Sequence, residues 1–150
     1  MKKIVLFLTF LWGHLFAMDA KSTINVYYEL FSSMTQKEKL SVYVMDKELK
    51  EIFSQSKHFV VSQDPSKADV VLLTDETSYI TVKQALSKHK SEAIPIFFTT
   101  DYHLLEDHPE IIGALYWKKG RSQLLFIKPR LQVYHIDLPQ EYDPFIIESL

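Results

Sequence analysis

The chain has 150 residues, with 17 Lys or Arg, 19 Asp or Glu and a formal net charge of −2. That length suits a single compact domain, and the small net charge excludes a polybasic nucleic-acid binder. The sequence has no Cys and three Gly, which excludes disulfides, thiolate metal sites, a cysteine nucleophile and a glycine-rich dinucleotide-binding loop.

The first element in chain order is an apolar segment that follows two lysines. Lys2 and Lys3 precede a mostly apolar run over residues 4–16, and the small residues Ala17 and Ala20 come next. This order is typical of a secretory signal peptide, and the run is shorter than the roughly 20 residues that span a bilayer. We therefore expect a signal peptide over residues 1–17, cleaved after Ala17 or Ala20, and a periplasmic mature chain, residues 18–150, without a transmembrane segment.

Helical and strand patterns alternate along the mature chain. Apolar residues at helical spacing predict helices over 22–37, 47–56 and 78–90, the first of them capped by Ser22. Short β-branched and aromatic runs predict strands at 40–45, 58–62, 69–74, 94–98, 111–117 and 123–127. Residues 101–107 are expected to form a short helical turn, Lys128-Pro129 to open a last helix, and residues 139–150 carry only a weak pattern.

This alternation predicts an α/β fold with a mostly parallel sheet flanked by helices. The nearly continuous apolar run over 69–74 suits a strand that is covered on both faces, which is typical of a parallel sheet. The tetrapeptide Lys118-Lys119-Gly120-Arg121 predicts a hairpin turn with Gly120 at positive φ, and this hairpin adds a C-terminal antiparallel edge. Because there is no internal repeat and no linker, we expect residues 18–150 to form one domain.

Polar residues follow several of the predicted strands. In open α/β sheets, ligands bind outside the carboxyl ends of the strands, where this sequence has Asp46, Asp75, Thr99 and Asp101. Such a rim could bind an amine, a cation or a hydroxylated ligand. The interpretation that we favour is helix capping, because Asp46, Thr77 and Asp101 come directly before helical segments and short acceptors there satisfy free N–H groups.

The sequence predicts no enzyme, no cofactor and no metal site. The segments DVVLLTD (69–75), IPIFFTT (94–100) and FIKP (126–129) resemble strand signatures of two-component receiver domains, but residues 64–68 are too few for the helix that a receiver needs. His103 and His108 are five residues apart, which does not fit the spacing of helical metal pairs. No order of Ser, His and Asp with a nucleophile elbow is present.

A basic segment lies beside two large aromatic residues near the C-terminus. Its cations are Lys118, Lys119, Arg121, Lys128 and Arg130. Tyr116 and Trp117 precede them, and one of this adjacent pair is expected to face outward because successive side chains on a strand alternate. Either this segment is a solvated hairpin tip, or it contacts an acidic partner or anionic head groups.

Five segments follow one another along the chain: SVYVMDKELKEIF (41–53), ADVVLLTD (68–75), IPIFFTTD (94–101), IIGALYWKKGR (111–121) and LLFIKPRL (124–131). This order of elements resembles that of the YfiR-like family of periplasmic regulatory proteins. The resemblance implies an exported regulator that binds the outer domain of an inner-membrane signalling protein, commonly a diguanylate cyclase, and restrains it.

Two functional hypotheses follow. The first is a regulatory protein-binding module whose contacts come from the hairpin and the first helix. We expect its contact residues to be Tyr116, Trp117, Lys119, Arg121, Tyr28 and Phe31. The alternative is a periplasmic small-molecule (solute) binding protein that uses the rim formed by Asp46, Asp75, Thr99 and Asp101.

Overall fold

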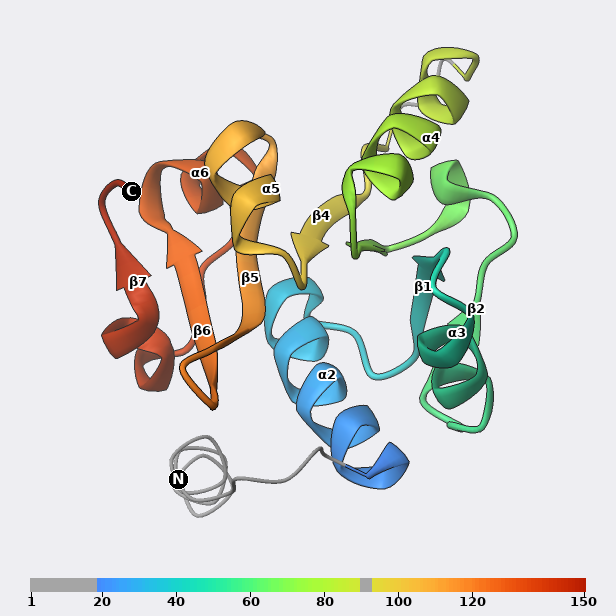
Figure 1. Cartoon of the computed structure of the whole chain (residues 1–150), viewed down its shortest axis with the longest axis horizontal. Helices are drawn as coiled ribbons and strands as arrows, with labels where there is room; N and C mark the ends of the chain where they lie inside the picture. Colours follow the sequence, from blue (N-terminus) through green and yellow to red (C-terminus); the bar gives the residue numbers. More distant parts are fainter. Residues whose placement is uncertain (1–18, 90–92) are drawn as a thin grey trace.

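The computed structural model describes residues 19–89 and 93–150, so the predicted signal peptide lies outside the described residues. Within them the chain forms a seven-stranded sheet in the order β2-β1-β3-β4-β5-β6-β7 (Figure 1). Its strands are β1 (Leu40–Val44), β2 (Phe59–Val61), β3 (Val70–Leu73), β4 (Ile96–Thr99), β5 (Ile111–Lys118), β6 (Arg121–Ile127) and β7 (Ile146–Ile147).

The sheet is mostly parallel. β2, β1, β3, β4 and β5 pair in parallel in that order, whereas β5 and β6 form an antiparallel hairpin. β7 pairs in parallel with β6 and forms the outermost strand. The expected α/β class, with a parallel sheet, flanking helices and an antiparallel pair towards one edge, is confirmed. The weakly patterned residues 139–150 supply that edge strand and a preceding 3-10 helix, η2 (Gln140–Phe145).

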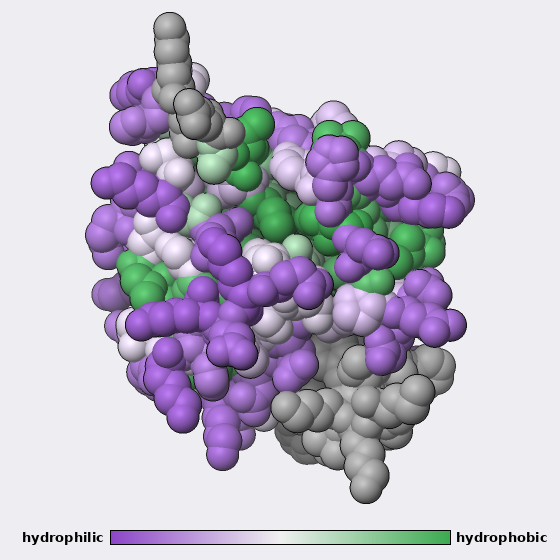
Figure 2. All heavy atoms as spheres, turned by 180° about the vertical axis from the view of Figure 1, so that it is seen from behind, coloured by the Kyte–Doolittle hydropathy of each residue, from purple (hydrophilic) through white to green (hydrophobic). Residues whose placement is uncertain are grey.

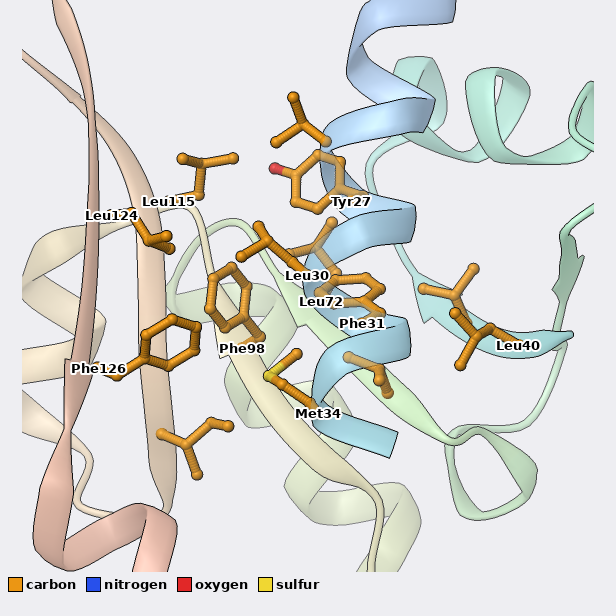
Figure 3. Close-up of a cluster of buried hydrophobic side chains, with 14 of the residues drawn as sticks. Tyr27, Leu30, Phe31, Met34, Leu40, Leu72, Phe98, Leu115, Leu124 and Phe126 are labelled. Carbon is orange, nitrogen blue, oxygen red and sulfur yellow. The ribbon is translucent and has the colours of Figure 1, made fainter. Parts of the chain in front are cut away.

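Helices cover both faces of the sheet. α2 (Ala20–Thr35), α3 (Lys47–Ser54) and α6 (Lys128–Val133) contribute to one apolar cluster. α4 (Glu76–Ser87) and α5 (Tyr102–Asp107) contribute to a second cluster on the opposite face. Figure 3 shows the first cluster, in which side chains of α2 point towards Leu72, Phe98, Leu115, Leu124 and Phe126 of the sheet.

The start of α2 differs from the prediction. The Asp19 carboxylate accepts a hydrogen bond from the Ser22 backbone N–H at 2.8 Å, so Asp19 is the N-cap and the helix begins at Ala20. Ser22 therefore lies inside the first turn, and its predicted role as N-cap is wrong. Both residues are good capping types, and spacing alone did not separate them.

The connection from β2 to β3 lacks the helix that usually covers such a crossover. The strand order 2-1-3-4-5 of the parallel part is that of doubly wound flavodoxin-like folds. Here the crossover contains only a 3-10 turn, η1 (Pro65–Lys67), as the short interval over 64–68 predicts. Val60 on β2 is 49% exposed, and strand alternation places it on the face opposite to buried Phe59.

A close contact fixes the position of the hairpin strand β6 on β5. The register between β4 and β5 shifts by a bulge, after which Phe98 pairs with Gly113. A Cβ atom on Gly113 would lie 2.6 Å from the Leu125 carbonyl oxygen and 2.7 Å from Cδ1 of Phe126, which is fully buried. Any larger residue therefore has to push β6 and the Phe126 ring away from β5.

We predict that Gly113→Ala destabilises the protein by about 3 kcal/mol, the upper end of overpacking costs, because a backbone oxygen and a buried ring cannot both move aside. Gly120→Ala is the comparison: no atom lies within 4 Å of its Cβ position, and its φ of 73° adds left-handed strain of about 1 kcal/mol. Urea unfolding measures both. An equal or smaller loss at position 113 contradicts the prediction.

Candidate functional site

The acidic residues at the carboxyl ends of the strands hold the starts of helices. The three carboxylates accept backbone hydrogen bonds at 2.9, 2.7 and 2.9 Å, from Leu49 to Asp46, from Ser78 to Asp75 and from His103 to Asp101. Capping is thus confirmed for Asp46 and Asp101. The predicted cap Thr77 lies inside α4, whose N-cap is Asp75. A ligand role for these carboxylates stays a prediction. Any ligand there would have to bind carboxylates that already accept hydrogen bonds from the helix N-termini.

Thr99 is not available to a ligand. Its side chain is fully buried, and its hydroxyl donates to the Leu73 carbonyl at 2.9 Å and accepts from the Asp101 N–H at 2.9 Å. The prediction that Thr99 lines a binding rim is wrong, because the hydroxyl ties the end of β4 to β3. Within residues 19–89 and 93–150, no group of three or more His, Asp or Glu side chains could hold a metal ion.

A cavity lies at the amino end of β4, opposite to the end at which Thr99 stands. It has a volume of about 360 Å³ and is lined by residues that include Leu86, Ile94 and Phe97. β4 begins at Ile96 and ends at Thr99, so this cavity is at the amino end of the strand. The predicted rim and the cavity are therefore separate features of the sheet.

We predict that Asp75→Ala lowers the free energy of unfolding by about 1 kcal/mol, because the Ser78 N–H at the start of α4 loses its acceptor. Thr77→Ala serves as the control, since Thr77 is exposed within the helix. We expect its effect to stay below about 0.5 kcal/mol, as for most surface changes. If urea unfolding shows that Thr77→Ala lowers the free energy of unfolding more than Asp75→Ala does, Thr77 is the N-cap, as the sequence predicted.

The β5–β6 hairpin turns through two residues. Lys119 and Gly120 both have positive φ, 51° and 73°, and Lys118 pairs with Arg121 across the turn. Two positive φ values define a type I′ turn, whose twist matches that of the flanking strands. The predicted Gly at positive φ is confirmed.

The hairpin presents one of its two adjacent aromatic residues to solvent. Trp117 is 56% exposed, whereas Tyr116 is partly buried and packs on Tyr102 of α5 with ring centroids 5.1 Å apart. The Lys118 ammonium lies 5.6 Å from the centroid of the same Tyr102 ring. The expectation that one of the pair faces outward is confirmed, and the outward residue is Trp117.

The predicted basic segment divides into two groups. Lys118, Lys119 and Arg121 are exposed at the hairpin tip. Lys128 and Arg130 lie beyond the other end of β6, roughly 20 Å away at the usual rise per strand residue. Arg130 donates from Nη1 to backbone carbonyls of Leu105, His108 and Ile111, and Lys128 pairs with Glu148 at 2.9 Å. These two cations are engaged within the fold.

The first helix contributes less surface than predicted. Phe31 is fully buried and packs against Phe59 and Phe98, so the prediction that it contacts a partner is wrong. The helical stripe that made it conspicuous is the face that packs on the sheet. Tyr28 lies at the margin of that face, partly buried, with its ring stacked on His58 at a centroid distance of 4.3 Å.

Exposed apolar residues also occur away from the hairpin. Ile80 on α4 and Val133 at the end of α6 are 47% and 74% exposed. Figure 2 shows several apolar patches among hydrophilic side chains on the face opposite to that of Figure 1. Exposure alone therefore does not select Trp117. What distinguishes Trp117 is its place near the end of β5, close to the tight turn that carries the exposed cations Lys118, Lys119 and Arg121.

A polar cluster between α4 and the start of β5 was not predicted. The Tyr79 hydroxyl donates to the Glu110 carboxylate, which also lies 3.2 Å from the Lys83 ammonium. The His108 ring stacks on Tyr79 at 3.5 Å, and its Nε2 lies 3.1 Å from both carboxylate oxygens of Glu76. Residues so far apart in sequence give no local signal, so sequence reasoning could not assemble this cluster.

Opposing effects set the pKa of Glu110. Burial disfavours its ionised form, but the hydrogen bonds from Tyr79 and Lys83 outweigh burial and hold the pKa below its ordinary value. Burial and the bond to Glu110 raise the pKa of Tyr79. A carboxyl group with a lowered pKa stabilises the fold above its unfolded pKa of 4.5, and this contribution is lost as the pH falls through the folded value.

We predict that Tyr79→Phe makes the loss of stability between pH 6 and pH 3 (about 1.5 units either side of the unfolded value) less steep, because Glu110 then titrates closer to its unfolded pKa. Tyr134→Phe is the matched control: the Tyr134 hydroxyl donates to the backbone carbonyl of Glu110 and not to its carboxylate. Urea midpoints across this pH range test the prediction, which fails when both variants show the wild-type slope.

Comparison with known proteins gives a fold and no family. No family model matches the sequence, and no curated protein matches it. The structure is similar to the crystal structure of a conserved domain protein from Vibrio cholerae, with a TM-score of 0.59 and 12% sequence identity. The match covers 88% of this chain and 60% of that one, and at this identity it shows the fold alone. Among the described helices, none has the length and apolar character to cross a bilayer.

Proposed function

We propose that this chain is an exported regulatory module that binds an inner-membrane signalling protein in the periplasm and restrains it. Two sequence features support the proposal. The lysine-led apolar segment over residues 1–17 has the order of a signal peptide. The succession of strands and helices resembles that of the YfiR-like regulators, and the partner class comes from that resemblance.

The observation that carries the proposal is the exposed Trp117 on the hairpin. A large exposed aromatic side chain on a hairpin that also carries Arg121, the cross-strand partner of Lys118, is typical of residues that dominate binding energy. The type I′ turn holds the tip in one conformation, so little conformational entropy is lost when a partner binds. Lys119 and Arg121 are exposed at the same hairpin tip and add charge that can orient an acidic partner.

The polar groups at the strand ends give little support to the solute-binding alternative. Asp46, Asp75 and Asp101 cap helices, and the Thr99 hydroxyl is engaged with backbone groups. These side chains have structural tasks that account for their presence. The solute-binding alternative relies on the same four residues and is correspondingly less supported.

Restraint of a signalling protein requires a difference in affinity between its two states. A module that binds the off state and the on state equally shifts nothing, however tightly it binds. Moving a partner from 99% on to 99% off takes a preference of about 10,000-fold for the off state. In the proposed mechanism, contacts of Trp117 that form only with the off state contribute to this difference.

We predict that Trp117→Ala weakens binding to the membrane partner about 30-fold, the size of a hot-spot contact, and leaves the fold intact. The measurement is quantitative co-purification from detergent-solubilised inner membranes, with circular dichroism and Tm as checks of folding. Ile80→Ala, which removes an exposed apolar side chain from α4, is the matched control and should bind like wild type. Equal retention of the same membrane protein by both variants counts against the proposal.

A further inference from the structure

Charge is segregated along the chain. From residue 111 to residue 136 the sequence contains no Asp and no Glu, although the whole chain has 19 of them. Three of the cations in this interval, Lys118, Lys119 and Arg121, are exposed at the hairpin tip, whereas Lys128 and Arg130 are engaged beyond the far end of β6. The tip is therefore a local positive site on a chain with a net charge of −2.

The tip also projects beyond the parallel part of the sheet. The last pair between β4 and β5 joins Thr99 to Ala114, and β5 continues to Lys118. Figure 1 shows the turn between β5 and β6 extending past the end of β4. Strand alternation places Trp117 and Lys118 on opposite faces of this ribbon. The tip thus presents the Trp117 indole on one face, Lys118 and its cross-strand partner Arg121 on the other, and Lys119 in the turn between them.

We infer that this tip docks on an anionic phospholipid surface, with the Trp117 indole among the head groups and Lys119 and Arg121 against phosphates. A standard protein interface takes about 800 Å² from each partner, so the proposed protein partner has to contact surface beyond this ring and these three cations, whereas the tip alone is enough for a bilayer interface. A single Trp side chain is readily accommodated at the interface of a bilayer. Each Lys or Arg near an anionic membrane surface strengthens binding about fivefold. The inference does not depend on the proposed protein partner.

Acidic groups near the tip lie on its other face. Asp101 caps α5, and Glu106 of α5 interacts with the hydroxyl of Tyr102, on which Lys118 and Tyr116 pack. Trp117 is on the opposite face of the hairpin, the face of α2 and the first apolar cluster. Lys118 and its cross-strand partner Arg121 share the face of these carboxylates, so the hairpin has to meet the membrane end-on, with the turn first, to bring both the indole and the cations to the surface.

The test uses the fluorescence of Trp117 itself. The chain has two Trp residues, so in a Trp12→Phe background Trp117 is the sole emitter. We expect a blue shift on adding protein-free vesicles of phosphatidylglycerol and phosphatidylethanolamine, and none with phosphatidylcholine vesicles. Lys119→Gln with Arg121→Gln should weaken vesicle binding about 25-fold, roughly fivefold for each cation. The apolar segment over 4–16 is common to all variants, so differences among them report the tip.

Matched controls separate the tip from general charge and exposure. Lys57→Gln removes an exposed cation from the loop before β2, and Val133→Ala removes an exposed apolar side chain at the end of α6. Both should bind vesicles like the parent. The inference is overturned by the absence of a blue shift on anionic vesicles, by an equal shift on neutral ones, or by a loss with Lys57→Gln equal to that at the tip. Tip-dependent binding only to membranes that retain their proteins also overturns it, and leaves the proposed function standing.

Discussion

A continuous row of aromatic rings joins the parts of this fold. Phe31 of α2 contacts Phe98 of β4 at a centroid distance of 5.7 Å, and Phe98 contacts Phe126 of β6 at 5.9 Å. Phe126 in turn meets Tyr142 of η2 edge to face at 6.0 Å. The row crosses from the parallel strands to the hairpin and on to the C-terminal segment. Because Phe126 also lies against Gly113, the hairpin has one position on the sheet, and the exposure of Trp117 follows from that position.

The sequence predicted those parts of the fold that have their own local pattern. Continuous apolar runs identified β3 and β4, and Lys119-Gly120 identified the hairpin turn, because each signal lies within a few residues. β7 is two residues long and exists through its pairing with β6, so no period could reveal it. The N-cap of α2 was misassigned since Asp19 and Ser22 are equally suitable types, and the contact between them decides the start.

The candidate site was predictable to the extent that it depends on alternation along one strand. The outward position of either Tyr116 or Trp117 followed from the pleat, whereas the choice between them depended on Tyr102 of α5, which shelters Tyr116. Phe31 was misassigned because a helical stripe does not say whether it meets the sheet or a partner. The cluster of Tyr79, Glu110 and Lys83 depends on the packing of α4 beside β5 and has no counterpart in local sequence.

The missing helix between β2 and β3 has a consequence for solubility. An uncovered strand at the border of a sheet, with an apolar side chain such as Val60 on its bare face, is a template on which another chain could add. Here that border strand has three residues, and the strand at the opposite border, β7, has two. Such short ladders offer too few free backbone groups to recruit a neighbour. The short edge strands therefore disfavour edge-to-edge aggregation, even though no helix covers the β2–β3 crossover.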